Sequence, residues 1–209
     1  MFGWSLFPSL LLSALVLSAP QNPSRRSIQK RNIECNSAYS IPTVSESFTL
    51  LAVNIDDDII QRPLVLGVIP GYQDGVTVVG TANTISKSYA TNFTMVNSSI
   101  ISVPLGGNAD VYLSMYVQTT SGLLEFMSKA SSATKLPVAS YCEEFNTSPH
   151  GVEFPFTIDV YGDSNNFSIC TTWDGTTDVI VYTPVNGTSL PYNGNTCIPV
   201  AVHAIHGFN

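Results

Sequence analysis

Basic residues are scarce in this chain of 209 residues, and four of its eight Lys and Arg residues lie before residue 32. All 15 acidic residues lie after residue 31, so residues 32–209 carry four basic and 15 acidic side chains, a formal net charge of −11. A surface of this charge repels phosphate backbones and anionic membranes. The composition therefore argues against nucleic acid and against a membrane surface as partners.

Long apolar runs are also lacking beyond the start of the chain. The run at residues 10–17 has the length of a signal peptide and is too short to cross a bilayer. We expect cleavage after Ser18, so that residues 1–18 form the signal peptide. The polar stretch that follows ends in Lys30-Arg31, a dibasic pair of the kind that secretory convertases cut, which predicts a pro-segment at residues 19–31; the alternative is an ordinary basic linker. Residues 32–209 then have the size of one domain.

The familiar catalytic motifs are missing as well. The chain has no Gly-x-Ser-x-Gly elbow, no His-Glu-x-x-His and no glycine-rich phosphate loop before a helix. We therefore expect no catalytic residue and no cofactor. A glycosidase remains the enzymatic alternative, because it needs only two facing carboxylates. Its candidate residues are Glu125, Glu143, Glu144, Glu153, Asp159 and Asp178.

Metal-ligand patterns are weak, and no CxxC pair occurs. His203 and His206 are three apart and would face opposite sides of a strand, so we interpret them as ordinary terminal histidines. The run Asp56-Asp57-Asp58 lacks the alternating spacing of a calcium loop and is interpreted as a solvated turn. No metal site is expected.

Four cysteines and five sequons are present instead. An even cysteine count behind a signal peptide predicts two disulfides, with three possible connectivities. We favour Cys170–Cys197, which would tie two C-terminal strands, and Cys35–Cys142, which would anchor the N-terminus. The sequons begin at Asn92, Asn97, Asn146, Asn166 and Asn186. Turn-like sequence favours glycans at Asn97, Asn146 and Asn186, whereas a following Phe suggests that burial protects Asn92 and Asn166.

Short runs of alternating or continuous apolar residues predict β-strands, and no sustained helical period occurs. The Asp174-Gly175 pair predicts a hairpin whose loop is longer than two residues. We therefore predict an all-β domain, a β-sandwich or closed barrel, with a β-trefoil as the alternative. The expected strands are 48–54, 63–69, 111–117, 122–127, 154–161, 166–173, 178–182 and 198–205.

Aromatic side chains are numerous, with ten Phe, nine Tyr and two Trp. Most are interpreted as filling a β core and its cross-strand pairs. An exposed subset could instead stack on sugar rings. Trp173 is one candidate for carbohydrate binding, and Tyr72 and Tyr192 are the tyrosines expected to be most exposed, because both lie among Pro, Gly and Asn residues.

The C-terminal half contains three short motifs, Phe167–Trp173, Val179–Tyr182 and Asn195–Val202, which follow an early strand at Phe48–Ala52 and a middle hairpin at residues 111–127. In these segments the chain resembles small secreted fungal proteins of the PhiA cell-wall type. The similarity covers most of residues 32–209 with short motifs, and residues 81–107 depart from it by being longer and richer in sequons. The resemblance supports the Cys170–Cys197 pairing best. It implies an extracellular or wall-associated fungal protein without established catalytic residues.

These observations together predict a non-enzymatic secreted or cell-wall glycoprotein, whose expected partner is cell-wall polysaccharide. The alternatives are a lectin-like carbohydrate binder, a glycosidase and a host-directed effector. The sequence does not separate a wall protein from an effector, because the two share this size and leader.

Overall fold

Antiparallel strands supply nearly all the regular structure in the computed structural model, which describes residues 35, 39–56, 60–103, 110–115, 117–118, 120–130, 140–145 and 155–207. Residues 32–209 form one compact unit. The predicted signal peptide (1–18) and pro-segment (19–31) lie outside the described residues, and so do Tyr116, Asn146 and Glu153.

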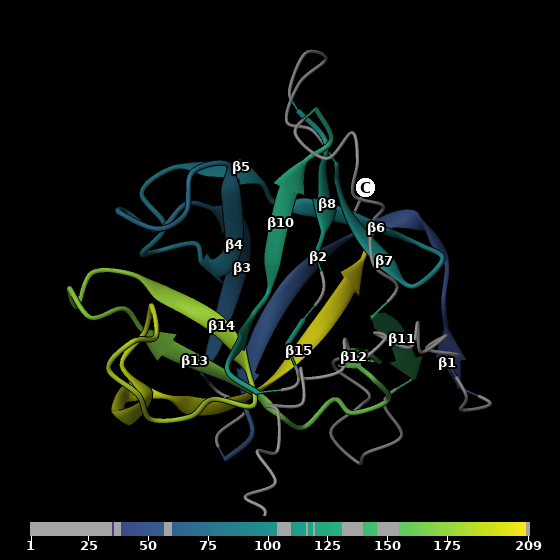
Figure 1. Cartoon of the computed structure of the whole chain (residues 1–209). Helices are drawn as coiled ribbons and strands as arrows, with labels where there is room; N and C mark the ends of the chain where they lie inside the picture. The colour runs from purple at the N-terminus through teal and green to yellow at the C-terminus, as the bar shows by residue number, and fades with distance from the viewer. Residues whose placement is uncertain are drawn as a thin grey trace, which may run out of the picture. The chain divides into compact units, whose positions relative to one another are not determined.

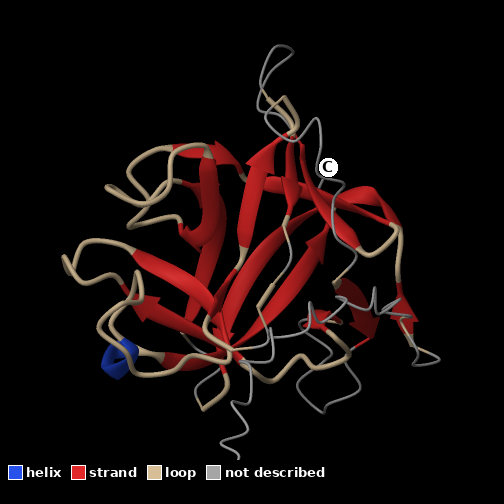
Figure 2. Cartoon of the chain, viewed as in Figure 1, coloured by secondary structure: helices blue, strands red, loops and turns tan. Residues whose placement is uncertain are grey.

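The described residues contain fifteen strands and one short 3-10 helix, and Figure 2 shows how completely strands dominate the fold. No α-helix occurs among these residues. The elements are β1 (Ser40–Ile41), β2 (Val44–Asn54), β3 (Gln61–Gly67), β4 (Val76–Thr81), β5 (Ser88–Ala90), β6 (Asn92–Val96), β7 (Ser99–Val103), β8 (Tyr112–Ser114), β9 (Gly122–Leu123), β10 (Glu125–Ser128), β11 (Tyr141–Phe145), β12 (Phe156–Val160), β13 (Phe167–Thr171), β14 (Asp178–Tyr182), η2 (Gly194–Thr196) and β15 (Ile198–His206).

Nine of these strands close into an antiparallel barrel. Its order is β2–β15–β13–β14–β4–β10–β8–β7–β6, and β6 pairs back to β2. Outside this ring, β3 pairs with both β2 and β4, while β12, β11 and β1 extend the sheet from β15 (Figure 1). Closure removes the free edges of the ring strands, which would otherwise invite pairing with other chains. The all-β prediction is confirmed in its closed-barrel form, which was preferred to the β-trefoil.

The barrel encloses the main hydrophobic core. Side chains alternate between the two faces of each strand, so every second residue points inward. In β2, Phe48, Leu50 and Ala52 are buried at this spacing. The rings of Phe48 and Phe126 both pack near Phe93, with centroids 6.3 and 6.1 Å away. The opposite face of β4 and β14 carries a second, smaller cluster of buried residues: Ile69, Val78, Leu123, Cys170, Val179, Val181 and Tyr192.

The two disulfides are those that the sequence analysis favoured. Cys170 joins Cys197 with Cα atoms 4.1 Å apart, and Cys35 joins Cys142 at 5.8 Å. The first bridge follows from the pairing of β13 with β15, because Ile169 lies opposite Ile198 and the cysteines are the next residues along. The second attaches Cys35 to β11, where its sulfur also lies 3.4 Å from the Ser98 hydroxyl.

Candidate functional site

Of the three aromatic residues predicted to bind carbohydrate, Trp173 is the most exposed, and it lies in the loop of the β13–β14 hairpin. The strands pair antiparallel from Phe167 opposite Tyr182 to Thr171 opposite Asp178, which leaves residues 172–177 as the loop. The Thr172 amide donates to the Thr177 carbonyl at 2.8 Å and closes the loop. Gly175 lies in the left-handed region with a φ of 73°, where glycine is favoured. The predicted hairpin with a loop longer than two residues is confirmed.

Trp173 projects from this loop with half of its surface exposed. Its indole nitrogen donates a hydrogen bond of 2.7 Å to the carbonyl of Leu190. Leu190 is partly buried and packs against the smaller hydrophobic cluster, which includes Cys170 and Val179. The ring is therefore held in one orientation while its apolar surface meets solvent. Such a ring can stack on a sugar without first losing conformational entropy.

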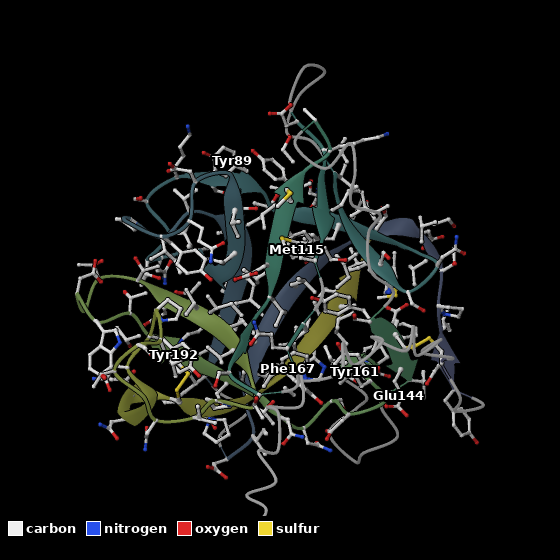
Figure 3. The ribbon with its side chains drawn as sticks, in the orientation of Figure 1. Tyr89, Met115, Glu144, Tyr161, Phe167 and Tyr192 are labelled. Carbon is white, nitrogen blue, oxygen red and sulfur yellow. A yellow bond between two sulfur atoms is a disulfide. The ribbon has the colours of Figure 1, made fainter. Side chains whose placement is uncertain are left out.

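Tyr192 was expected to be exposed, and that expectation is wrong. Its side chain is fully buried, and its hydroxyl accepts a hydrogen bond from the amide of Val185 at 3.2 Å. A bridge between Thr172 and Tyr192 brings residues 183–197 across the outer face of β13 and β14. Tyr192 then fills the space under this segment, close to the disulfide between Cys170 and Cys197 (Figure 3).

Tyr72 lies at the margin of the same cluster and is half-buried. Its hydroxyl donates to the carboxylate of Glu125 at 2.5 Å. Burial, followed by this hydrogen bond, raises the pKa of the Tyr72 hydroxyl well above its ordinary value. The structure thus places all three predicted carbohydrate-binding residues around one cluster, but of these three only Trp173 has an exposed ring, with half of its surface open to solvent.

Five of the six remaining described tyrosines fit the core interpretation, and the sixth, Tyr39, is exposed. Tyr112, Tyr141 and Tyr182 are buried in the main core, and Tyr89 and Tyr161 pack partly buried against it. The Tyr161 hydroxyl donates to the Val117 carbonyl at 2.6 Å, and its ring contacts that of Tyr182 edge-on. These tyrosines support the fold from inside, which confirms that most aromatic side chains serve the core.

Of the described carboxylates considered for a glycosidase, Glu144 and Asp159 share one face of the sheet and interact through charge, whereas the others are held in separate contacts. Glu143 is buried and pairs with Nε2 of His206, which packs between the rings of Phe48 and Phe156. Burial raises the pKa of Glu143, although the His206 contact opposes this shift. No sequence signal pointed to this pair, because its partners are 63 residues apart.

Asp159 lies on the neighbouring strand but on the other face of the sheet. It stands opposite Cys142, whereas Glu143 stands opposite Ile158, so the two carboxylates point to opposite faces. Asp159 is buried and accepts a hydrogen bond from the Gly162 amide at 3.2 Å. Burial raises the pKa of Asp159 to about 6. Glu144 shares the face of Asp159 and is half-exposed.

Asp178 belongs to an ion pair at the end of β14. Its carboxylate accepts from the Arg62 guanidinium at 3.0 Å and from the Thr171 hydroxyl at 2.8 Å. These contacts join β3, β13 and β14 at one end of the ring. Asp178 thus has a structural role here, as Glu125 has beside Tyr72.

His203 and His206 lie on opposite faces of β15, as predicted. His206 shares the face of the core residues Val202 and Ala204, whereas His203 is buried on the other side with Nδ1 3.2 Å from the Phe156 carbonyl oxygen. Among the residues that the structure describes, no group of three or more His, Cys, Asp or Glu side chains could hold a metal ion. Asp56 is exposed, and Asp57 and Asp58 lie outside the described residues.

The asparagines of the described sequons differ in how exposed their side chains are. Asn97 and Asn186 are exposed, and Asn92 is half-buried between β2 and β7. The expectation that burial protects Asn166 is wrong: it is exposed just before β13, and only Phe167 enters the core. Its Nδ2 donates to Asp163 at 2.5 Å.

We expect glycans at Asn97 and Asn186 and none at Asn92. In the protein secreted from a fungal host, Asn97→Gln and Asn186→Gln should each remove one glycan mass, and Asn92→Gln should leave the intact mass pattern unchanged apart from the substitution. Thr188→Ala is the matched control, because it destroys the Asn186 sequon without touching the asparagine. Loss of a glycan from Asn92→Gln would contradict the prediction.

Comparison with family models, with curated proteins and with solved structures gave no match. In the described part of the chain, no helix is long and apolar enough to span a membrane. The two disulfides are in keeping with an extracellular protein.

Proposed function

We propose that this chain is a secreted, wall-associated fungal glycoprotein that binds cell-wall polysaccharide and catalyses no reaction. The observation that carries the proposal is Trp173, whose half-exposed ring is fixed by its hydrogen bond to Leu190. Sugar rings have an apolar C–H face, and an oriented indole offers that face a large contact area at low entropic cost. In this proposal the protein associates with the wall by binding carbohydrate through Trp173, as a lectin does.

Two further features support the proposal. Three of the five described carboxylates that were candidates for acid–base chemistry are held by contacts that stabilise the fold: Glu143 by His206, Asp178 by Arg62 and Glu125 by Tyr72. Three features of the sequence support an extracellular, wall-associated location: the predicted leader, the sequons and the resemblance to PhiA-type proteins.

The proposal is tested by fractionating a fungal culture that secretes the tagged protein. The wild-type chain should be retained in the wall fraction, and Trp173→Ala should release most of it into the medium. In pull-downs with purified wall polysaccharide, the same variant should bind about tenfold more weakly, as for the loss of a central aromatic anchor.

The matched control is Phe145→Ala, which removes a different exposed aromatic ring, on β11. It should be retained like the wild type. Recovery of the wild-type protein only from the cytosol, or wall retention unaffected by Trp173→Ala, would contradict the proposal.

A further inference from the structure

Asp174 follows Trp173 in the same loop and presents a fixed, exposed carboxylate. Its Oδ1 accepts hydrogen bonds from the Thr172 hydroxyl at 2.5 Å and from the Thr176 amide at 3.1 Å, and its Oδ2 accepts from the Thr176 hydroxyl at 2.8 Å. These hydrogen bonds, that from Thr172 first, lower the pKa of Asp174. The side chain is fixed by the loop itself. Each carboxylate oxygen has two lone pairs, so Oδ2 can accept a further hydrogen bond from a ligand.

The loop therefore displays two groups that both attract a cation. The face of an indole ring attracts an ammonium group through its quadrupole, and tryptophan is the best side chain for this interaction. A carboxylate attracts the same group through charge and accepts its N–H bonds, which are stronger than those between neutral partners. An uncharged sugar would use the ring but would gain little from the carboxylate charge.

The charge of the whole domain acts in the same direction. Residues 32–209 carry a formal net charge of −11, so a polycation is drawn towards the surface and a polyanion is repelled. The aromatic ring selects a flat pyranose face, and the adjacent carboxylate selects a positive charge on that sugar.

We propose that the β13–β14 loop binds a polysaccharide whose sugar units carry protonated amines, as in β-1,4-linked glucosamine. Trp173 stacks on the pyranose ring, and Asp174 accepts hydrogen bonds from the ammonium group of the same or the adjacent unit. This inference rests on the proposed function and specifies the chemical class of its ligand.

Calorimetric titration at about pH 5.5 tests it with three hexasaccharides: β-1,4-glucosamine, its fully N-acetylated form and β-1,3-glucose. The wild-type protein should bind the glucosamine hexamer at least fivefold more tightly than either neutral hexamer. Added salt should weaken only this binding, because screening acts on the charge interaction. Trp173→Ala should bind each hexamer more weakly than the wild-type protein does.

Asp174→Asn separates the carboxylate from the ring, because the amide keeps an oxygen that can accept from Thr176 but has no charge. It should lose most of the preference for the glucosamine hexamer, and the net charge of the domain should account for what remains. Asp110→Asn, which removes an exposed carboxylate before β8, is the matched control and should retain the preference.

The outcomes distinguish the two proposals. Equal affinity of the wild-type protein for all three hexamers, or an unchanged preference in Asp174→Asn, would overturn the inference and leave the polysaccharide proposal standing. Binding of none of the hexamers, together with no retention on wall polysaccharide, would overturn both. The comparison of ligands uses the wild-type chain, so it stays decisive even if a variant folds poorly.

Discussion

Replacing both Cys35 and Cys142 with alanine should lower the free energy of unfolding by about 5 kcal/mol. The bridge spans 107 residues, and the chain-entropy estimate for a loop of that length gives this magnitude. It also holds the start of the domain against β11, where a free terminus would fray. Chemical denaturation of the purified variant, followed by tryptophan fluorescence, measures the change.

The double variant of Cys170 and Cys197 is the matched comparison. Its bridge spans only 27 residues, for which the same estimate gives about 3.5 kcal/mol. Removing it should therefore cost less stability than removing Cys35–Cys142. The reverse order would show that chain entropy is not the main contribution of these bridges. Peptide mapping without reduction should recover both pairs, and a Cys142–Cys170 peptide would contradict the strand pairing described above.

Asp159→Asn should stabilise the protein at neutral pH by up to about 3 kcal/mol and change little near pH 3. Burial raises the pKa of Asp159 from 3.8 to about 6, and each pKa unit corresponds to about 1.4 kcal/mol. Well below pH 3.8 the carboxyl is protonated in both the folded and the unfolded chain, so it contributes no penalty. Between about pH 4 and 6 the unfolded chain loses this proton first, and the folded state therefore loses stability as the pH rises.

The asparagine removes this penalty while its side-chain oxygen can still accept from the Gly162 amide. Denaturation curves at pH 3.5, 5 and 7 should show a gain that grows with pH. Asp110→Asn, at an exposed position, should show no comparable trend. A loss of stability in Asp159→Asn at pH 7 would mean that the charged carboxylate stabilises the turn after β12.

Much of the barrel could be predicted from local pattern. The strand at residues 178–182 has the predicted bounds, because Val179 to Tyr182 form a continuous apolar run that is buried on both faces. The strands β6 and β7 were missed because Ser, Thr and Asn dilute their pattern. Only the turn between them was predicted, from the turn-like sequence at Asn97. Asn97 and Ser98 both have positive φ there, at 48° and 61°, a conformation that Asn tolerates in two-residue hairpins.

The candidate site was predictable only in part. Trp173 was singled out by residue type alone, as an aromatic side chain that could stack on a sugar. Tyr192 was misjudged because Pro, Asn and Gly neighbours indicate a turn, but they do not show whether that turn folds back over a sheet. The Glu143 and His206 pair joins β11 to β15, and no local pattern connects residues so far apart in the chain.

By itself, the sequence determined the all-β class, the even number of cysteines that predicts two disulfides, and the acidic character of the domain. These properties follow from composition and from periods of two residues, which act locally. Only the tertiary structure decided that nine strands close into a ring, that Tyr192 is buried while Trp173 is exposed, and that Glu143 and Asp159 face opposite sides of one sheet. Those outcomes depend on register and on which segments pack together, and both are set by contacts between residues that are distant in the chain.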